Sequence, residues 1–154
     1  MSTQTNTRTY TIQEAAKLSG LPESTLRYYE TIGLISPIAR DPSSKHRVYR
    51  EPDINNILSI ACLNATGLSI NDMRSYMENS DIGFNAATEQ IDLLESQSRK
   101  LVEEEKFLKL RQKYLRTKVK YWKAIAGRNE NLASDIVKES LEIAEELKLN
   151  KGNN

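Results

Sequence analysis

The sequence predicts a mainly α-helical protein, with several short helices and a small β-hairpin in its first half and one long helix after them. Two observations support this fold class. Most of the four prolines and six glycines lie before residue 84, so helices there must be short. From about residue 86 to residue 126 neither residue type occurs, and an apolar residue recurs at every seventh position, which is typical of a long helix that pairs with another.

The composition favours a water-soluble, extended protein. Hydrophobic residues make up 38% and charged residues 28% of the 154 residues, which is a more polar composition than a compact globular protein has. One cysteine excludes an intrachain disulfide, and the chain lacks a run of about 18 apolar residues that could span a membrane. Residues 1–9 are polar and do not resemble a signal peptide. We therefore expect a cytoplasmic protein with a disordered arm over residues 1–9 and no membrane partner.

Two short helices are expected between residues 10 and 31. Thr11 can cap a helix over residues 12–18, and Glu14 stands where a capping box places its carboxylate. The Ser-Gly-Leu-Pro run at residues 19–22 then breaks the chain. A second helix follows from Pro22 to about Thr31, because proline is tolerated in the first turn of a helix. Two short helices around a glycine-containing turn are typical of a helix-turn-helix.

A hairpin and two further helices complete the first half. Residues 34–50 carry turn formers centrally and β-formers outside, which predicts a two-stranded wing. A third helix opens at residues 51–53, and Gly67 ends it. Its predicted apolar stripe consists of Ile54, Leu58, Ala61, Cys62 and Ala65. Ser69 can cap a fourth helix that presents Met73, Tyr76 and Met77 on one face.

The long helix carries a heptad row that predicts self-association. The row consists of Leu94, Leu101, Leu108, Leu115 and Trp122. The companion positions are polar at Ser98, Glu105 and Gln112, which weakens the case for a parallel zipper, so an antiparallel pair or packing elsewhere fits as well. A single helix of about 40 residues would be roughly 60 Å long, too long to fold back on its own domain. A short amphipathic tail helix is expected within residues 127–154.

Charge and aromatic residues in the first half indicate a polyanionic partner. The net charge is only +1, and residues 1–80 carry eight basic and eight acidic residues. The basic residues are clustered, however, because a basic loop extends from Arg40 to Arg50. Arg27, Tyr28 and Tyr29 project from the second predicted helix beside that loop. Such a helix next to a basic hairpin suits a polyanion with a groove, most simply duplex DNA.

Four motifs carry a family resemblance: YTIQEAAKLSG at residues 10–20, TLRYYETIGLI at 25–35, RVYREPDI at 47–54 and TGLSINDM at 66–73. With these motifs the chain resembles the MerR family of bacterial transcription regulators. The resemblance covers residues 10–80 as sequence and 84–126 as architecture. Pro22 departs from the family pattern, which often has a serine cap there. The resemblance implies a winged helix-turn-helix domain, an antiparallel coiled-coil homodimer, and a regulator that distorts promoter DNA for RNA polymerase.

Within this picture the candidate residues divide by role. The candidate DNA contacts are Thr11, Ser24, Arg27, Tyr28, Tyr29, Arg40, Lys45, Arg47 and Tyr49. Residues of the second helix would meet the major groove, and the basic wing residues would hold phosphates. Tyr29 could equally belong to the core, and Tyr49 could pack the wing onto the third helix. His46 is expected to be a solvated loop residue. Dimerisation is assigned to the Leu94–Trp122 row.

Cys62 is the candidate sensor. On physical grounds we expect Cys62 to be a small core residue on the third helix. The run IACLNATGLSI at residues 60–70 resembles the AdhR/NmlR subgroup, in which a cysteine at this place is implicated in responses to aldehydes and other electrophiles. Reactivity requires a thiolate with some access to solvent. One Cys and one His, far apart in sequence, argue against a metal sensor, and we expect no cofactor.

Several alternatives remain at this level. Cys62 as a catalytic nucleophile would have only His46 as a base, and that residue lies in the predicted wing, so we do not expect an enzyme. A drug-sensing member of the same family would use an apolar pocket of the tail and coiled coil. An architectural factor resembling winged excisionases would bind DNA without regulating, and a coiled-coil adaptor would bind protein through the winged domain.

Overall fold

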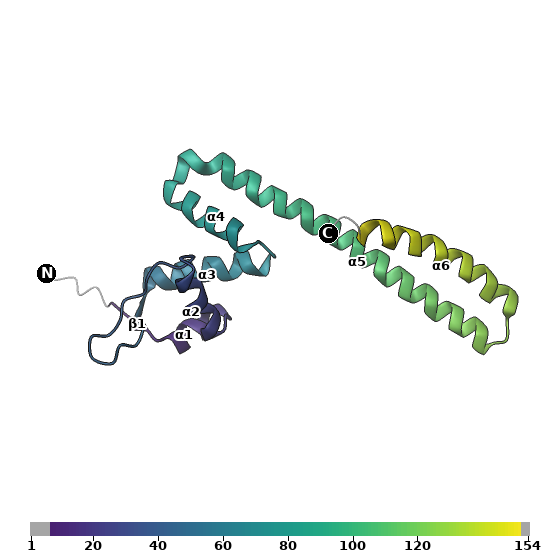
Figure 1. The fold of residues 1–154 in the computed structure, drawn as a ribbon, viewed down its shortest axis with the longest axis horizontal. Coiled ribbons are helices and arrows are strands. Elements are labelled where there is room, and N and C mark those ends of the chain that lie inside the picture. Colours follow the sequence, from purple (N-terminus) through teal and green to yellow (C-terminus); the bar gives the residue numbers. More distant parts are fainter. Residues whose placement is uncertain (1–6, 152–154) are drawn as a thin grey trace. The chain divides into compact units, whose positions relative to one another are not determined.

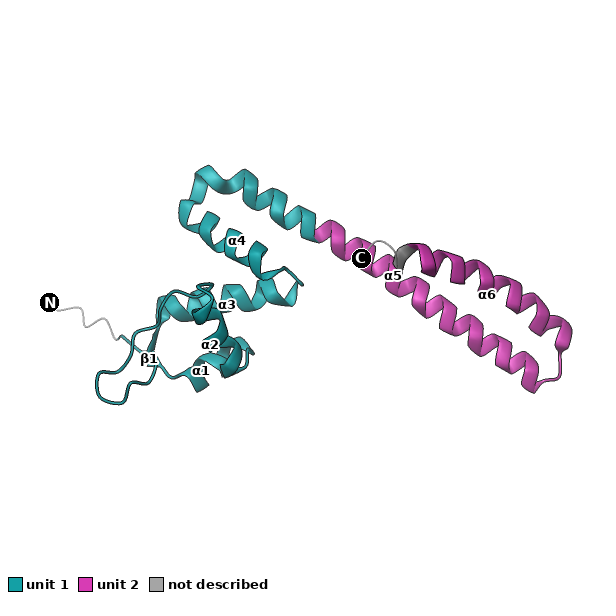
Figure 2. Cartoon of the chain, in the orientation of Figure 1, with its two compact units in different colours: residues 1–97 teal, residues 98–154 magenta. Residues whose placement is uncertain are grey.

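The computed structural model describes residues 7–151 and confirms a mainly α-helical chain (Figure 1). The elements follow the order β1 (Thr9–Tyr10), α1 (Ile12–Ser19), α2 (Glu23–Thr31), β2 (Tyr49–Arg50), α3 (Glu51–Ala65), α4 (Ile70–Ile82), the 3₁₀ turn η1 (Gly83–Ala86), α5 (Ala87–Ala126) and α6 (Glu130–Lys151). Two compact units divide the chain, residues 1–97 and residues 98–154 (Figure 2). In the described residues, no helix is long and apolar enough to cross a membrane.

The start of α1 forms as local chemistry predicts. The Thr11 hydroxyl accepts a hydrogen bond from the Glu14 amide at 3.2 Å, and the Glu14 carboxylate accepts one from the Thr11 amide at 3.2 Å. This capping box satisfies two amides that the helix itself leaves without partners. Gly20 ends α1 with a φ of 72°, a conformation that glycine adopts without steric cost. Pro22 precedes α2 with no side-chain capping hydrogen bond, so the serine cap of the family pattern is missing here.

The wing differs from a regular two-stranded hairpin. Its two arms meet at one isolated bridge, between Arg40 and Arg47, supported by a 2.8 Å hydrogen bond from the Val48 amide to the Ala39 carbonyl. The second arm continues into β2, which pairs with β1 in antiparallel register. Pro37 lacks an amide hydrogen, so the first arm is short of a donor for a longer ladder.

The pairing of β1 with β2 corrects the predicted extent of the N-terminal arm. Thr9 is opposite Arg50 and Tyr10 is opposite Tyr49, so residue 9 belongs to a strand and not to a disordered arm. Residues 1–6 lie outside the described residues.

The core of the first unit assembles on a face of α3 that differs from the predicted stripe. Ile54, Ile57 and Ile60 are buried, whereas Leu58 and Cys62 are exposed. Isoleucines at positions i, i+3 and i+6 give a second helical stripe beside the predicted one. The core lies between α3 and the helices α1, α2 and α4, and this packing selects the isoleucine face. The placement of Cys62 on a buried stripe was therefore wrong.

In the second unit, α6 runs back antiparallel along α5 (Figure 2). Ala124 of α5 packs with Ala133 and Ile136 of α6, and Tyr121 is partly buried against them. Asn129 caps α6 by accepting a hydrogen bond from the Leu132 amide at 3.1 Å. Among the apolar residues of α6, Ile136 and Ile143 are buried, whereas Leu132 and Leu141 are exposed.

The predicted heptad row lies on an exposed face of α5. The exposed fractions are 43% for Leu94, 41% for Leu101, 51% for Leu108, 64% for Leu115 and 64% for Trp122. The residues of α5 that α6 covers are different ones, including Thr117 and Ala124. Within the single chain the row therefore remains without a partner.

Candidate nucleic-acid interface

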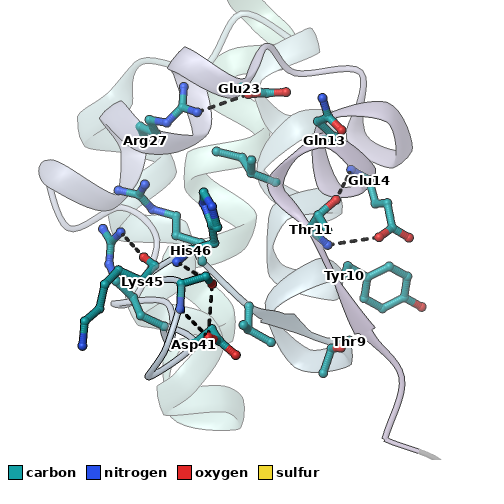
Figure 3. A pocket seen from close by; sticks show the side chains of 15 residues that line it. Thr9, Tyr10, Thr11, Gln13, Glu14, Glu23, Arg27, Asp41, Lys45 and His46 are labelled. Atoms are coloured by element: carbon teal, nitrogen blue, oxygen red, sulfur yellow. Dashed lines mark hydrogen bonds and ion pairs between the residues drawn. The ribbon is translucent and has the colours of Figure 1, made fainter.

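A cleft of about 670 Å³ opens between the wing and the first two helices (Figure 3). One wall is built from β1 and the start of α1, a second from α2, and the third from the wing. The lining residues are Thr9, Tyr10, Thr11, Ile12, Gln13, Glu14, Glu23, Arg27, Arg40, Asp41, Ser44, Lys45, His46, Arg47 and Val48. The cleft therefore combines a helix N-terminus, a helix face and a basic loop.

The α2 wall presents Arg27. Its guanidinium donates to the Glu23 carboxylate at 3.2 Å, one helical turn earlier, and both side chains are partly exposed. An exposed pair of this kind contributes about 0.3–0.5 kcal/mol, so a phosphate or base can replace Glu23 at little cost. Tyr28 is 51% exposed, and Ser24 is exposed near the start of the same helix. These three predicted contacts are all accessible.

The wing wall presents Arg40 and Lys45. Both are exposed, and the Arg40 guanidinium donates to the Lys45 carbonyl at 3.1 Å. The turn between them is held by Asp41, whose carboxylate accepts from the Ser44 amide at 2.7 Å and the Ser43 amide at 2.9 Å. These amide hydrogen bonds lower the pKa of Asp41. The turn therefore offers its bases on an ordered loop.

Two predicted contacts belong to the core instead. Tyr29 is 5% exposed, and its hydroxyl donates to the Asn64 side-chain oxygen at 3.4 Å. Tyr49 is 1% exposed, and burial raises the pKa of its hydroxyl. Neither side chain is accessible to DNA in this structure, so we withdraw both as contacts. Adjacent tyrosines on a helix point about 100° apart, so the burial of Tyr29 leaves Tyr28 outside.

Glu30 was not among the predicted site residues, and it changes the interpretation of Arg47. The Arg47 Nε donates to the Glu30 carboxylate at 2.6 Å, with side chains only 17% and 14% exposed. Arg47 lines the cleft but is engaged inside the protein. The sequence shows an acidic residue near the end of the second helix and a basic loop after it. Which base pairs with that acid is decided only by the tertiary contact.

Two other residues line the cleft. Gln13, which the sequence did not single out, lies in the first turn of α1 beside Thr11, and His46 lies exposed on the wing, as expected. The Thr11 end of α1 is exposed, and a helix N-terminus attracts anions through its amides. Glu14 already places a carboxylate at that end, so a phosphate there would compete with it.

Cys62 borders a separate hollow of about 380 Å³ between α3 and α4. The other lining residues are Leu58, Ser59, Leu63, Thr66 and Tyr76, and none of them is cationic. The base of α5 is anchored close by, because the Gln97 side chain donates to the Thr66 carbonyl at 2.8 Å and the Gln90 side chain donates to the Tyr76 carbonyl at 2.9 Å. In the part of the chain that the structure describes, no three His, Cys, Asp or Glu side chains gather to hold a metal ion.

The geometry of the first unit agrees with the comparisons to known proteins. The family model of the MerR HTH family regulatory proteins matches residues 10–80. An HTH-type transcriptional regulator of Haemophilus influenzae is 32% identical over 91 residues, which cover 59% of this chain and 67% of that protein. The chain belongs to the MerR family. The excisionase-like and adaptor alternatives are therefore set aside.

Other MerR-family comparisons extend the likeness beyond the DNA-binding unit. The crystal structure of HiNmlR, a MerR family regulator lacking the sensor domain and bound to promoter DNA, aligns with a TM-score of 0.61 at 30% identity, covering 77% of this chain and 94% of that one. A putative MerR family regulator from Listeria monocytogenes aligns with a TM-score of 0.63 at 29% identity, covering 85% and 99%. The regulator AdhR of Bacillus subtilis is 37% identical over 92 residues, 60% of this chain and 65% of AdhR.

Proposed function

We propose that this MerR-family protein is a homodimeric transcription regulator that binds a palindromic promoter site. The observation that carries the proposal is the cleft in which Arg27 of α2 faces Arg40 and Lys45 of the wing. A helix with an exposed arginine can enter the major groove, while a basic loop beside it holds the sugar-phosphate backbone. The promoter-DNA complex of HiNmlR supports the same use of this unit.

The contacts divide into base reading and positioning. Arg27, Tyr28 and Ser24 are the accessible residues of α2 and would approach base edges and the adjoining backbone. Arg40 and Lys45 would bind phosphates. Because the cleft also contains Glu14, Glu23 and Asp41, its charge is nearly balanced, and we expect a shallow dependence of affinity on salt.

Two copies are expected to pair through the exposed heptad row of α5. The charge along α5 supports an antiparallel arrangement: residues 87–105 carry six acidic and two basic residues, and residues 106–126 carry eight basic and no acidic residues. In a parallel pair like charges would face each other at the positions that flank the row, whereas an antiparallel pair places acids opposite bases. The dimer would present two α2 helices to the two halves of a palindrome.

The DNA-binding proposal is tested with duplexes selected from a random pool by the wild-type protein. Arg27→Met should weaken binding by about 1–3 kcal/mol and relax sequence preference, and Lys45→Met should weaken binding evenly and lower the salt slope by about one. Lys120→Met, which changes an exposed lysine of α5 that does not line the cleft, is the matched control. Selection of no duplex by the wild type, or unchanged binding by Arg27→Met, would contradict the proposal.

Bending of the selected duplex, measured by fluorescence energy transfer between its ends, tests promoter distortion. Recruitment of RNA polymerase to the same duplex tests the proposal that the polymerase is a partner.

We further propose that the inducer is an electrophile such as an aldehyde, or an oxidant, that modifies Cys62. The exposed thiol and the hollow beside it support this input, and the likeness to AdhR favours the same subgroup. The signal would reach α5 through Thr66 and Tyr76, which border the hollow and whose carbonyls are held by Gln97 and Gln90.

A promoter reporter challenged with an aldehyde, an oxidant and a lipophilic cationic drug tests the input. Cys62→Ser should abolish the aldehyde or oxidant response, and Ser59→Ala, which alters the same hollow without touching the thiol, should keep it. An unchanged aldehyde or oxidant response in Cys62→Ser would refute thiol sensing. A response to the drug alone would favour the drug-sensing alternative. The α5–α6 groove of about 530 Å³ suits a cation poorly, because four bases (Lys106, Lys109, Lys113 and Arg116) outnumber the two acids Glu103 and Glu146 in its lining.

A further inference from the structure

One carboxylate ties both arms of the wing to α2. Glu30 lies in the last turn of α2, and one of its carboxylate oxygens accepts a hydrogen bond from the Ile38 amide at 2.9 Å. The other oxygen accepts from the Arg47 Nε at 2.6 Å. Ile38 lies at the base of the first arm and Arg47 lies on the second. Glu30 is therefore bonded to residues on both sides of the wing.

The environment of Glu30 keeps its carboxylate ionised and bound to its two partners. Burial raises the pKa of Glu30, but the hydrogen bonds from the Ile38 amide and the Arg47 guanidinium, with the charges of Arg47 and Arg40, outweigh burial and lower it. The carboxylate is therefore ionised at neutral pH. A largely buried ion is retained only where such partners satisfy it, and removal of one partner leaves an uncompensated charge.

The position of Glu30 relates this contact to the cleft. Glu23, Arg27 and Glu30 are spaced by four and three residues, so they share one face of α2. The backbone hydrogen bonds within the wing, among them those from the Val48 amide to the Ala39 carbonyl and from the Asp41 amide to the His46 carbonyl, join its arms to each other and not to α2. The place of the exposed bases Arg40 and Lys45 relative to Arg27 therefore depends on what holds the base of the wing.

We infer that Glu30 is a positioning residue for DNA binding, which holds the wing at the angle where its bases and Arg27 reach one duplex together. Arg47 completes this clamp and acts through Glu30 rather than as a simple phosphate contact. This inference rests on the proposed DNA-binding function of the cleft, but the clamp itself can be tested without DNA.

The first test is limited trypsin digestion of the full chain at neutral pH. Glu30→Gln should speed cleavage after Arg40 and Lys45, because the wing is released, while circular dichroism shows that the helices remain. Glu23→Gln is the matched control, since it removes a carboxylate from the same face of α2 that contacts only Arg27 among the described hydrogen bonds. Should Glu30→Gln fail to fold, Arg47→Lys, which keeps the charge but lacks Nε, must give the faster cleavage.

The second test is a double-mutant cycle on a duplex selected by the wild-type protein. Glu30→Gln should weaken binding roughly tenfold, and its effect should vanish in the Arg40→Met/Lys45→Met background, where the two exposed wing bases that it positions are gone. In an Arg27→Met background the tenfold effect should persist. Equal losses in all backgrounds, or unchanged trypsin cleavage, would overturn the inference. Selection of no duplex by the wild type would instead refute the proposed function, with the cleavage result still deciding the clamp.

Discussion

Removal of one leucine from the exposed row of α5 should weaken the dimer strongly. Full burial of a leucine side chain is worth about 1.5–3 kcal/mol, and Leu115 is 64% exposed in the single chain, so burial in a dimer can still contribute about 1–2 kcal/mol. Symmetry places two copies in the interface. Leu115→Ala should therefore cost about 2–4 kcal/mol of association free energy, which raises the dimer dissociation constant roughly 30- to 1,000-fold.

Sedimentation equilibrium over a dilution series measures this constant, and Leu141→Ala provides the control. Leu141 is 61% exposed on α6 and lies off the row, so the same substitution should leave the constant within a factor of about three, given the small effects usual at surface sites. A wild-type chain that stays monomeric at high concentration would refute the reasoning. A Leu141→Ala loss as large as that of Leu115→Ala would show that a different face forms the interface.

Three further predictions follow from the first unit. Cys62 should react with a thiol reagent such as dithionitrobenzoate in the native protein, without denaturant, because it is exposed; reaction only after unfolding would contradict this placement. Tyr29→Phe should lower stability by about 1 kcal/mol in urea unfolding while leaving duplex affinity unchanged, because its hydroxyl contacts Asn64 inside the protein; a loss of affinity at unchanged stability would return Tyr29 to the DNA surface. Because the pKa of Glu30 is lowered in the folded protein, its contribution to stability is present above the ordinary glutamate pKa of 4.5 and is lost as pH falls through the folded pKa. The wild type should therefore lose more stability than Glu30→Gln below about pH 4.5. Parallel profiles of stability against pH would show that Glu30 is not responsible.

Local signals predicted the helices well. The capping box of Thr11 and Glu14 and the Ser69 cap, whose hydroxyl accepts from the Asp72 amide at 3.1 Å, form between residues three apart in sequence. Interactions of that range are written in the sequence, because the partners are already neighbours before the chain folds. The repeat of Leu94 to Trp122 likewise indicated one uninterrupted helix, and α5 spans 40 residues.

Faces and long-range partners were harder to predict. The third helix contains two overlapping apolar stripes, and only contact with the other helices of the first unit decided that Ile57 and Ile60 are buried and Cys62 exposed. In the tail helix, likewise, packing against α5 decides that Ile136 is buried while Leu132 and Leu141 stay exposed. Periodicity gives the spacing of a stripe, and the neighbouring elements select among stripes of similar hydrophobicity.

The sequence by itself determined the mainly α-helical fold, the helix-turn-helix with its wing, and the accessible pair Arg27 and Tyr28, because motifs and caps act over a few residues. Tertiary structure alone decided that Tyr29 and Tyr49 are core residues and that Arg47 is paired with Glu30, 17 residues away. A basic or aromatic residue in a motif has the same chemistry whether it faces solvent or the interior. Its role is settled by the burial and the partner that folding gives it.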